Sequence, residues 1–311
     1  MPNLVLELLA RPIPEKLWHY TSITGFQGIV ESKRIWATDA RFLNDREELI
    51  HIDQFADEVI EAATERDKEL VSLALRLARI RGLRVFVACF TELEDNLSQW
   101  RGYSHDSIGV SLAFDFRLVR PPAAAESVVA FAPCIYSDER KGVLVNEALR
   151  HFIDAVRNFY PEIYEVACQE DPTKRNRKDK RNVVKEFLDA NPHETQRLVL
   201  PVVRARIFYL QVAALSKNSS FQGEREWRLV LPMFEEPDRP LDNPPQFRAG
   251  KTTLIPFIAH PTNGPTHGFP LVDVILGPGS DEDSVSAARR FLKLKELNIE
   301  PRVSKVPYRQ L

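Results

Sequence analysis

The sequence predicts an α+β fold with a helical insertion and a C-terminal strand–helix–strand unit. Three observations predict it. Apolar runs of strand length gather between residues 84 and 136, apolar residues recur at helical spacing within 139–216, and strand, helix and strand patterns succeed one another from residue 272 onward. The composition nowhere shifts sharply enough to mark a linker, so we expect a single domain over residues 1–311.

Composition limits the class of protein. The 311 residues are 44% hydrophobic and 28% charged with only 12 Gly, which excludes a disordered or fibrous chain. The formal net charge of -2 gives no overall positive field to attract nucleic acid or a membrane. Three scattered cysteines, Cys89, Cys134 and Cys168, fit a reducing compartment, and no apolar run is long enough for a membrane span or a signal peptide. We therefore expect a cytoplasmic protein without a membrane partner.

The first elements are a strand at 17–21 and a helix at 22–33, whose apolar residues fall on one side. Apolar residues at helical spacing continue from 51 to 80 and predict a helical cover for the sheet. Further strands are expected at 84–91, 108–116 and 127–136.

The second half begins with the helical insertion at 139–216, in which Pro201 interrupts the later apolar stretch. Residues 226–231 return to a strand, and the proline-rich residues 237–247 are expected to form a surface loop. The closing unit consists of a strand at 272–276, a helix that begins at Ser280 and a strand at 299–306.

Three short segments carry polar groups where a plain core strand would have none. They are residues 18–21 (WHYT), residues 90–91 (FT) with 98–103 (SQWRGY), and residues 222–228 (QGEREWR). The first two also have purely structural interpretations: an edge strand whose histidine is only hydrogen-bonded, and a helix whose Trp100 packs inward.

In the third segment, Glu224 and Glu226 are two places apart and should point the same way if the segment is a strand. Like charges on one face repel unless cations or a substrate lie between them. Arg225 falls on the opposite face, so Arg228 is the cation that could pair with Glu226. The structural alternative for Glu226 is thus a salt bridge on a solvated sheet face.

The order of these segments resembles the ADP-ribosyltransferase superfamily. Residues 17–30 (LWHYTSITGFQGIV), a strand with His-x-Thr followed by a helix with Gly-Ile-Val, are similar to the first motif of that superfamily. Glu226 opens the strand EWRLV, where the superfamily places its catalytic glutamate, and the spacing from Glu224 is similar to that of transferases that modify arginine. The resemblance implies an ADP-ribosyltransferase-like split β-sheet.

Across its whole length, the sequence also resembles a bacterial family catalogued as domain of unknown function 2971. Its members share a start like WHYTS, an Asn-Asp-x-x-Glu as in residues 44–48, a Cys-Phe strand followed by a Trp-containing helix, a Glu-x-Glu-Trp/Tyr-Arg strand and an Ile-Leu-Gly near the end. Two features depart from the transferases: Phe90-Thr91 replaces a tyrosine or a Ser-Thr-Ser, and the insertion at 139–216 has no counterpart in the smallest members.

The resemblance to transferases implies a NAD-dependent mono-ADP-ribosyltransferase, with NAD as substrate and a protein or nucleic acid as acceptor, in a bacterial toxin or antiviral defence setting. Glu226 would stabilise the oxocarbenium-like transition state as nicotinamide leaves, and Glu224 would orient or deprotonate the acceptor. The residues expected to hold NAD are His19 and Thr21 on the adenosine side, Tyr20, Phe90, Trp100 or Tyr103 against nicotinamide, Arg41 or Arg101 at the pyrophosphate, and Ser98 of the middle motif.

Other functions remain open from the residues alone. The alternatives are a nucleotide- or partner-binding module of the same fold without turnover, a NAD glycohydrolase, and an enzyme acting on RNA. The basic cluster from Lys174 to Lys185 is either a solvated helix face or a nucleic-acid contact. Residues 277–280 (GPGS) favour a tight turn capped by Ser280 over a phosphate cradle, and the seven histidines show no metal-ligand spacing, so no metal is expected.

Overall fold

The computed structural model describes residues 11–43, 52–63, 83–103, 109–116, 129–159, 192–234, 244–250, 252–261 and 269–307, with a few single positions between them. The expected helical cover beyond residue 63, the Asn-Asp-x-x-Glu of residues 44–48, Cys168 and the basic cluster from Lys174 to Lys185 lie outside the described residues, apart from the single position 68.

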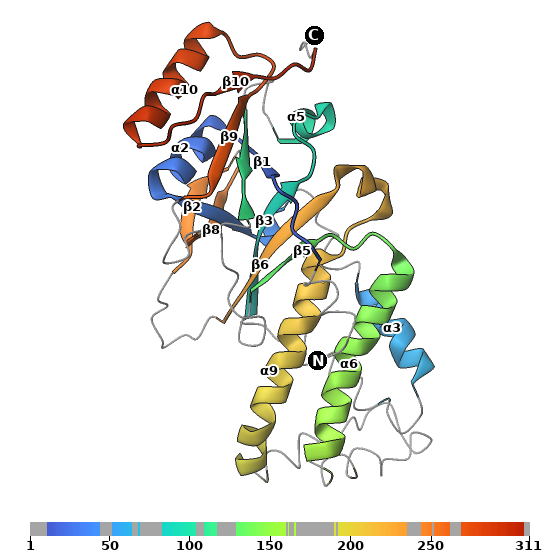
Figure 1. Ribbon diagram of the computed structural model, residues 1–311. Helices are drawn as coiled ribbons and strands as arrows, with labels where there is room; N and C mark the ends of the chain where they lie inside the picture. The colour runs from blue at the N-terminus through green and yellow to red at the C-terminus, as the bar shows by residue number, and fades with distance from the viewer. Residues whose placement is uncertain are drawn as a thin grey trace.

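The described residues form a mixed α/β structure around a large, mostly antiparallel, open sheet (Figure 1). Its strands are β1 (Leu17–Thr21), β2 (Arg34–Asp39), β3 (Leu83–Thr91), β4 (Val110–Phe114), β5 (Ala130–Pro133), β6 (Glu226–Phe234), β7 (Gln246–Ala249), β8 (Leu254–Pro261), β9 (Leu271–Leu276) and β10 (Arg302–Val303). The helices are α2 (Ile23–Ser32), α3 (Asp53–Ala62), α5 (Leu97–Tyr103), α6 (Asp138–Phe159), α9 (Pro192–Leu215) and α10 (Glu282–Leu294), with short 3-10 turns η1 (Ala40–Phe42) and η4 (Ser219–Glu224).

The sheet divides at β3. One edge of β3 pairs with β6 along its whole length, from Leu83 opposite Phe234 to Thr91 opposite Glu226. The other edge pairs with β1 only at Thr91 and with β2 only at Phe86 and Val87. Among the described residues, Ala88–Phe90 therefore have no strand partner on that edge. We call this stretch, with the flanking parts of β1 and β2, the fork.

Beyond the fork, the sheet continues in two directions. On one side the order is β1, β4, β9 and β10, and on the other it is β2, β8 and β7. The pairs are antiparallel except that β10 lies parallel to β9, with α10 between them in the chain. This arrangement confirms the strand–helix–strand unit expected at the C-terminal end.

The β1–α2–β2 connection follows from local residue choices. Ser22 caps α2, since its hydroxyl accepts a hydrogen bond of 3.1 Å from the Gly25 backbone N–H, and Lys33 ends the helix in the left-handed conformation, at φ 52°. Gly28 is required by packing: a Cβ there would lie 2.1 Å from Cζ2 of Trp36. Helix α2 is thus packed closely against β2.

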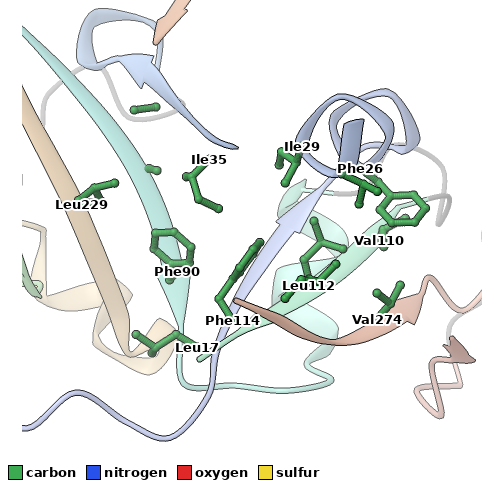
Figure 2. Close-up of a cluster of buried hydrophobic side chains, with 14 of the residues drawn as sticks. Leu17, Phe26, Ile29, Ile35, Phe90, Val110, Leu112, Phe114, Leu229 and Val274 are labelled. Carbon is green, nitrogen blue, oxygen red and sulfur yellow. The ribbon is translucent and has the colours of Figure 1, made fainter. Parts of the chain in front are cut away.

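Each face of the sheet is covered by its own set of helices. One face carries Phe86, Ala88 and Phe90 of β3 and packs against α2 and α10, and Figure 2 shows part of this core. The opposite face carries Val85 and Val87 of β3 and packs against α3, α6 and α9. Helices α6 and α9 pack against each other and extend beyond the sheet (Figure 1).

Several elements differ from the sequence-based expectation. Pro201 does not interrupt the insertion, because α9 continues through it as one helix. Residues 246–247 belong to β7 and not to the proline-rich loop, and β2 and β8 were not expected at all. Strand β5 and the closing strand β10 are shorter than expected. Asp281, and not Ser280, caps α10, by accepting the Ser284 N–H at 2.8 Å.

Among the helices in the described ranges, none combines the length and the apolarity that crossing a membrane requires.

Candidate functional site

The two glutamates of the third segment do not lie on one strand. Glu224 ends η4, Arg225 follows in the left-handed conformation at φ 45°, and β6 begins at Glu226. Strand alternation therefore does not align the two carboxylates, and that expectation was wrong. The carboxylates nevertheless share one partner, because the ammonium of Lys217 lies 2.6 Å from Oε2 of Glu224 and also bonds Oε2 of Glu226.

Arg228 closes this group of charges from the other side. Its Nε donates to Oε1 of Glu226 at 2.7 Å, and its Nη1 donates to the Ala214 carbonyl of α9 at 2.7 Å. We call Lys217, Glu224, Glu226 and Arg228 the glutamate cluster. The cluster joins the end of α9 to the beginning of β6, which are neighbours in space and separated in the chain by η4.

Most of the glutamate cluster is buried. Glu226 is 3% exposed, Arg228 1% and Lys217 5%, whereas the side chain of Glu224 is 22% exposed. The expected Glu226–Arg228 pair therefore exists, but it is a buried pair and not a bridge on a solvated face. Burial alone would raise the pKa of Glu226, but the positive charges of Arg228 and Lys217 outweigh burial and lower this pKa to about 2.

Neighbouring strands complete the surroundings of Glu226. Its backbone N–H donates to the hydroxyl of Tyr136 at 3.0 Å, and its carbonyl accepts the Cys134 N–H at 2.8 Å. Burial raises the pKa of Tyr136, which stays a neutral phenol. The thiol of Cys89, on the same face of the sheet, also helps to lower the pKa of Glu226 through hydrogen bonding. The carboxylate is thus enclosed by groups from β3, β6 and the end of α9.

In the first segment, His19 lies at the fork. Its Nδ1 is 2.8 Å from the carbonyl oxygen of Cys89, and its ring lies 5.6 Å from that of Phe90. Desolvation lowers the pKa of His19 to about 4, the hydrogen bond to Cys89 opposes this, and the positive charge of Arg248 lowers it further. The imidazole is neutral at pH 7, so Nδ1 carries the proton that faces the carbonyl and Nε2 is left as an acceptor.

The neighbours of His19 have structural contacts. The Tyr20 hydroxyl donates to the Glu94 carbonyl at 2.9 Å and accepts the Asn96 N–H at 3.0 Å. Thr21 ends β1, and its hydroxyl oxygen lies where a Cβ on Gly25 would come within 2.1 Å of it. Tyr20 thus holds residues 94–96 against β1, and Thr21 lies close to Gly25 of α2. The expected roles of both residues in NAD binding stay predictions.

The middle segment is also largely committed to packing. Phe90 is 2% exposed and Trp100 0%, and Trp100 Nε1 donates to Asp95 at 2.6 Å. Ser98 is exposed, with its hydroxyl on Asn96, and Arg101 is exposed on α5. The side chain of Tyr103 lies outside the described part of the chain. This placement agrees with the structural interpretation of an inward-packed Trp100.

Arg41, the other candidate for the pyrophosphate, pairs with a carboxylate. Its Nε and Nη2 bond the two oxygens of Asp39 at 3.0 and 2.6 Å, and Arg84 reaches the same carboxylate at 3.4 Å. The fork formed by Nε and Nη2 is therefore occupied by Asp39, and a phosphate would have to bind on the Nη1 side of this guanidinium.

The faces of the sheet decide which candidates can act together. Directly paired residues of an antiparallel ladder point to the same side, so Glu226 shares a face with Thr91, and Arg228 shares that face with Cys89. Phe90 and Trp227 point to the other side, and His19 packs there against Phe90. His19 and Glu226 thus lie on opposite faces, and the expectation that both residues converge on one cleft was wrong.

Two residues of this region were missed from the sequence. Lys217 follows a long apolar helix and belongs to no recognisable motif, so no pattern of residues marks it as the partner of both glutamates. Arg248 directly follows the proline-rich residues 237–247 that predicted a loop, and the strand β7 to which it belongs is only four residues long. Pairing in space is the only signal that could identify either residue.

A separate surface hollow of about 740 Å³ lies between α3 and α6. Its lining includes Phe55, Val59 and Leu149 together with charged residues such as Glu58 and Arg150, and none of the expected site residues contributes to it. In the described ranges, no three His, Cys, Asp or Glu residues gather in a way that could hold a metal ion.

In the comparison with protein families, residues 99–229 match the family described as Protein of unknown function (DUF2971). The matched stretch runs from α5 to β6 and contains the whole glutamate cluster. No curated protein and no solved structure matches the chain. The segment that builds the glutamate cluster is thus similar to the DUF2971 family, whose description names no activity.

Proposed function

We propose that this chain is a nucleotide-binding module in which the fork binds the ligand and Glu226 performs no catalysis. NAD is the nucleotide that the resemblance to ADP-ribosyltransferases implies. One observation carries this choice over catalysis: His19, with an open acceptor nitrogen, and Glu226, with an enclosed carboxylate, lie on opposite faces of the sheet. A dinucleotide bound against His19 therefore does not meet Glu226.

The state of His19 supports a role in binding. Nδ1 is anchored on the Cys89 carbonyl, which fixes the ring and its tautomer, and among the described residues none hydrogen-bonds Nε2. A fixed, neutral imidazole presents one lone pair, and the hydroxyls of a ribose are suitable donors to it. The ring is half-buried, so such a hydrogen bond would be partly shielded from water.

The state of Glu226 supports a structural role. Both carboxylate oxygens have cationic partners, and the residue is 3% exposed. A ribose could reach the carboxylate only after the ion pair with Lys217 or Arg228 opened, and breaking a buried pair costs about 3–5 kcal/mol. Glu226 thus holds α9 and β6 together in the proposed module.

NAD-dependent ADP-ribosyl transfer to a protein or nucleic-acid acceptor is the second candidate. The ionised state of Glu226 favours it, because a carboxylate with a pKa of about 2 keeps its charge at pH 7 and could stabilise an oxocarbenium ion. Glu224 shares the Lys217 ammonium and is more exposed, as a group that orients an acceptor would be. This candidate requires Lys217 to move away from Glu226 when NAD binds.

Calorimetry with NAD and product analysis with labelled NAD test both candidates on the full chain. The His19→Asn variant keeps a donor for the Cys89 carbonyl and removes the Nε2 acceptor, so we expect NAD to bind about tenfold more weakly. His19→Gln is the matched comparison, because its amide can reach the Nε2 position and so supply an acceptor there. The Glu226→Gln variant should bind NAD like the parent and unfold at a lower temperature.

The opposite results are equally clear. Transfer of labelled ADP-ribose to an acceptor by the parent, abolished in Glu226→Gln at an unchanged melting temperature, would establish the transferase and overturn the binding module. A parent chain that shows no affinity for NAD or for any other nucleotide would exclude both.

A further inference from the structure

Arg248 is a partly buried cation without a carboxylate partner in the described part of the chain. Its Nη2 donates to the Thr38 hydroxyl at 2.9 Å, and no ion pair joins it to a described Asp or Glu. Burial lowers the pKa of this guanidinium, with no compensating charge. Arg228, which is 1% exposed, has the Glu226 carboxylate. Arg248 therefore differs from Arg228 in lacking a counter-ion.

The strand register places Arg248 beside the fork. Thr38, which accepts its hydrogen bond, is 8% exposed and pairs with Val87, the last residue of β3 before the unpaired stretch begins. Arg248 reaches Thr38 across β8 from the outer strand β7. Its positive charge also acts on His19. The ladder puts Thr38 on the same face as Val87 and Glu226, whereas His19 points to the other face, so Arg248 and His19 border one gap in the sheet from opposite sides. A ligand that contacts both groups has to pass through this gap.

Neighbouring acids do not neutralise Arg248. Asp39, the residue after Thr38, is 1% exposed and has both carboxylate oxygens bonded to Arg41, with Arg84 on the second oxygen. A desolvated charge without a partner is unfavourable, and a guanidinium binds the oxygens of a phosphate by parallel hydrogen bonds. An anion from outside the chain would supply the missing partner.

We propose that Arg248, together with the Thr38 hydroxyl, forms a binding site for the phosphate group of a ligand held at the fork. As the site for the pyrophosphate of NAD, the assignment rests on the proposed function. As a site for free phosphate, it stands independently. Arg248 takes the place of Arg41 and Arg101, which the sequence indicated for this role.

Three probes distinguish the sources of the anion: NAD, inorganic phosphate, and adenosine, which has no phosphate. Arg248→Gln should weaken NAD binding by about tenfold to a hundredfold and leave any adenosine binding unchanged, because only a charge-assisted contact is lost. Arg248→Lys keeps the charge but not the planar guanidinium, so its affinity for NAD should lie between those of the parent and Arg248→Gln. Arg34→Gln is the matched control, since Arg34 lies exposed on β2 and, among the described residues, bonds the Ala259 carbonyl alone.

Melting temperatures provide the readout that does not depend on NAD. Inorganic phosphate should raise the melting temperature of the parent and of Arg34→Gln, and should not raise that of Arg248→Gln, because a ligand stabilises only the state that binds it. Equal phosphate shifts in the parent and Arg248→Gln, or no shift in the parent, would overturn the site.

The two proposals can fail separately. Phosphate binding through Arg248 without NAD binding would leave the anion site and remove the nucleotide function. NAD binding that is unaffected in Arg248→Gln would keep the nucleotide function and remove Arg248 from it.

Discussion

The imidazole of His19 donates its Nδ1 hydrogen to the carbonyl oxygen of Cys89 at 2.8 Å. That carbonyl belongs to the stretch of β3 that has no strand partner on the fork side among the described residues. A buried carbonyl without a hydrogen bond is costly, so a side chain here replaces the neighbouring strand. The division of the sheet and the state of His19 therefore depend on each other.

His19 should make stability fall as the solution is acidified. Its pKa is lowered from 6.5 to about 4 in the folded chain, so the folded state binds fewer protons than the unfolded one. The resulting stability is complete above 6.5 and is lost as pH falls toward 4. The melting temperature should differ less between about pH 7 and about pH 5 for His19→Asn than for the parent.

His151 and His260 also have lowered pKa values and act in the same direction, so the comparison between parent and variant isolates His19. An unchanged pH difference in His19→Asn would show that His19 titrates as an ordinary exposed histidine.

Glu226→Gln should destabilise the fold by about 3–5 kcal/mol, because it leaves Lys217 and Arg228 buried with too little negative charge. The double variant Lys217→Met with Glu226→Gln should lose less than the sum of the two single changes, since it removes both members of one pair. Urea unfolding measures all three. Glu300→Gln, in an exposed pair with Arg289, is the control that should behave like the parent. Additive losses would contradict a coupled pair.

The glutamate cluster should weaken at a lower pH than His19 does. The pKa of Glu226 is lowered from 4.5 to about 2, so its contribution to stability is present above 4.5 and is lost as pH falls toward 2. Between about pH 5 and about pH 2, the free energy of unfolding should therefore fall less in Glu226→Gln than in the parent. Parallel curves for the two proteins would mean that Glu226 has a normal pKa.

Gly28→Ala should destabilise the chain although alanine favours helices. A Cβ at position 28 would lie 2.1 Å from the indole of Trp36, which is also stacked on Phe257 at 4.4 Å and has little room to move. Overpacking of this kind costs about 1–3 kcal/mol. Gly142→Ala in α6 is the matched control, because its Cβ would meet Phe55 at an ordinary 3.7 Å and should stabilise the helix. Equal melting temperatures for parent and Gly28→Ala would refute the contact.

The sequence determined those elements that have a clear local pattern of residues. Strand-like patterns predicted β1, β3, β6 and β9, helical spacing predicted α2, and the start signal at Ser280 predicted the helix that the structure shows as α10. The same reasoning missed β7 because prolines precede it, and it broke α9 at Pro201 although the surrounding helix is held by its packing against α6 and the sheet. Local propensity is a weak guide wherever tertiary contacts supply most of the stability.

The candidate site was decided by tertiary structure. The sequence marked His19 and Glu226 as chemically important, but the side of the sheet on which each lies depends on the register of β3 against β1 and β6. A shift of one residue exchanges the two faces, and no local pattern around either residue reports that register. Lys217 and Arg248 could not be predicted as partners either, because the spacing of residues along the chain does not report which charges folding brings together. The sequence by itself determined which residues can carry chemistry, and the pairing of the strands decided which of them can work together.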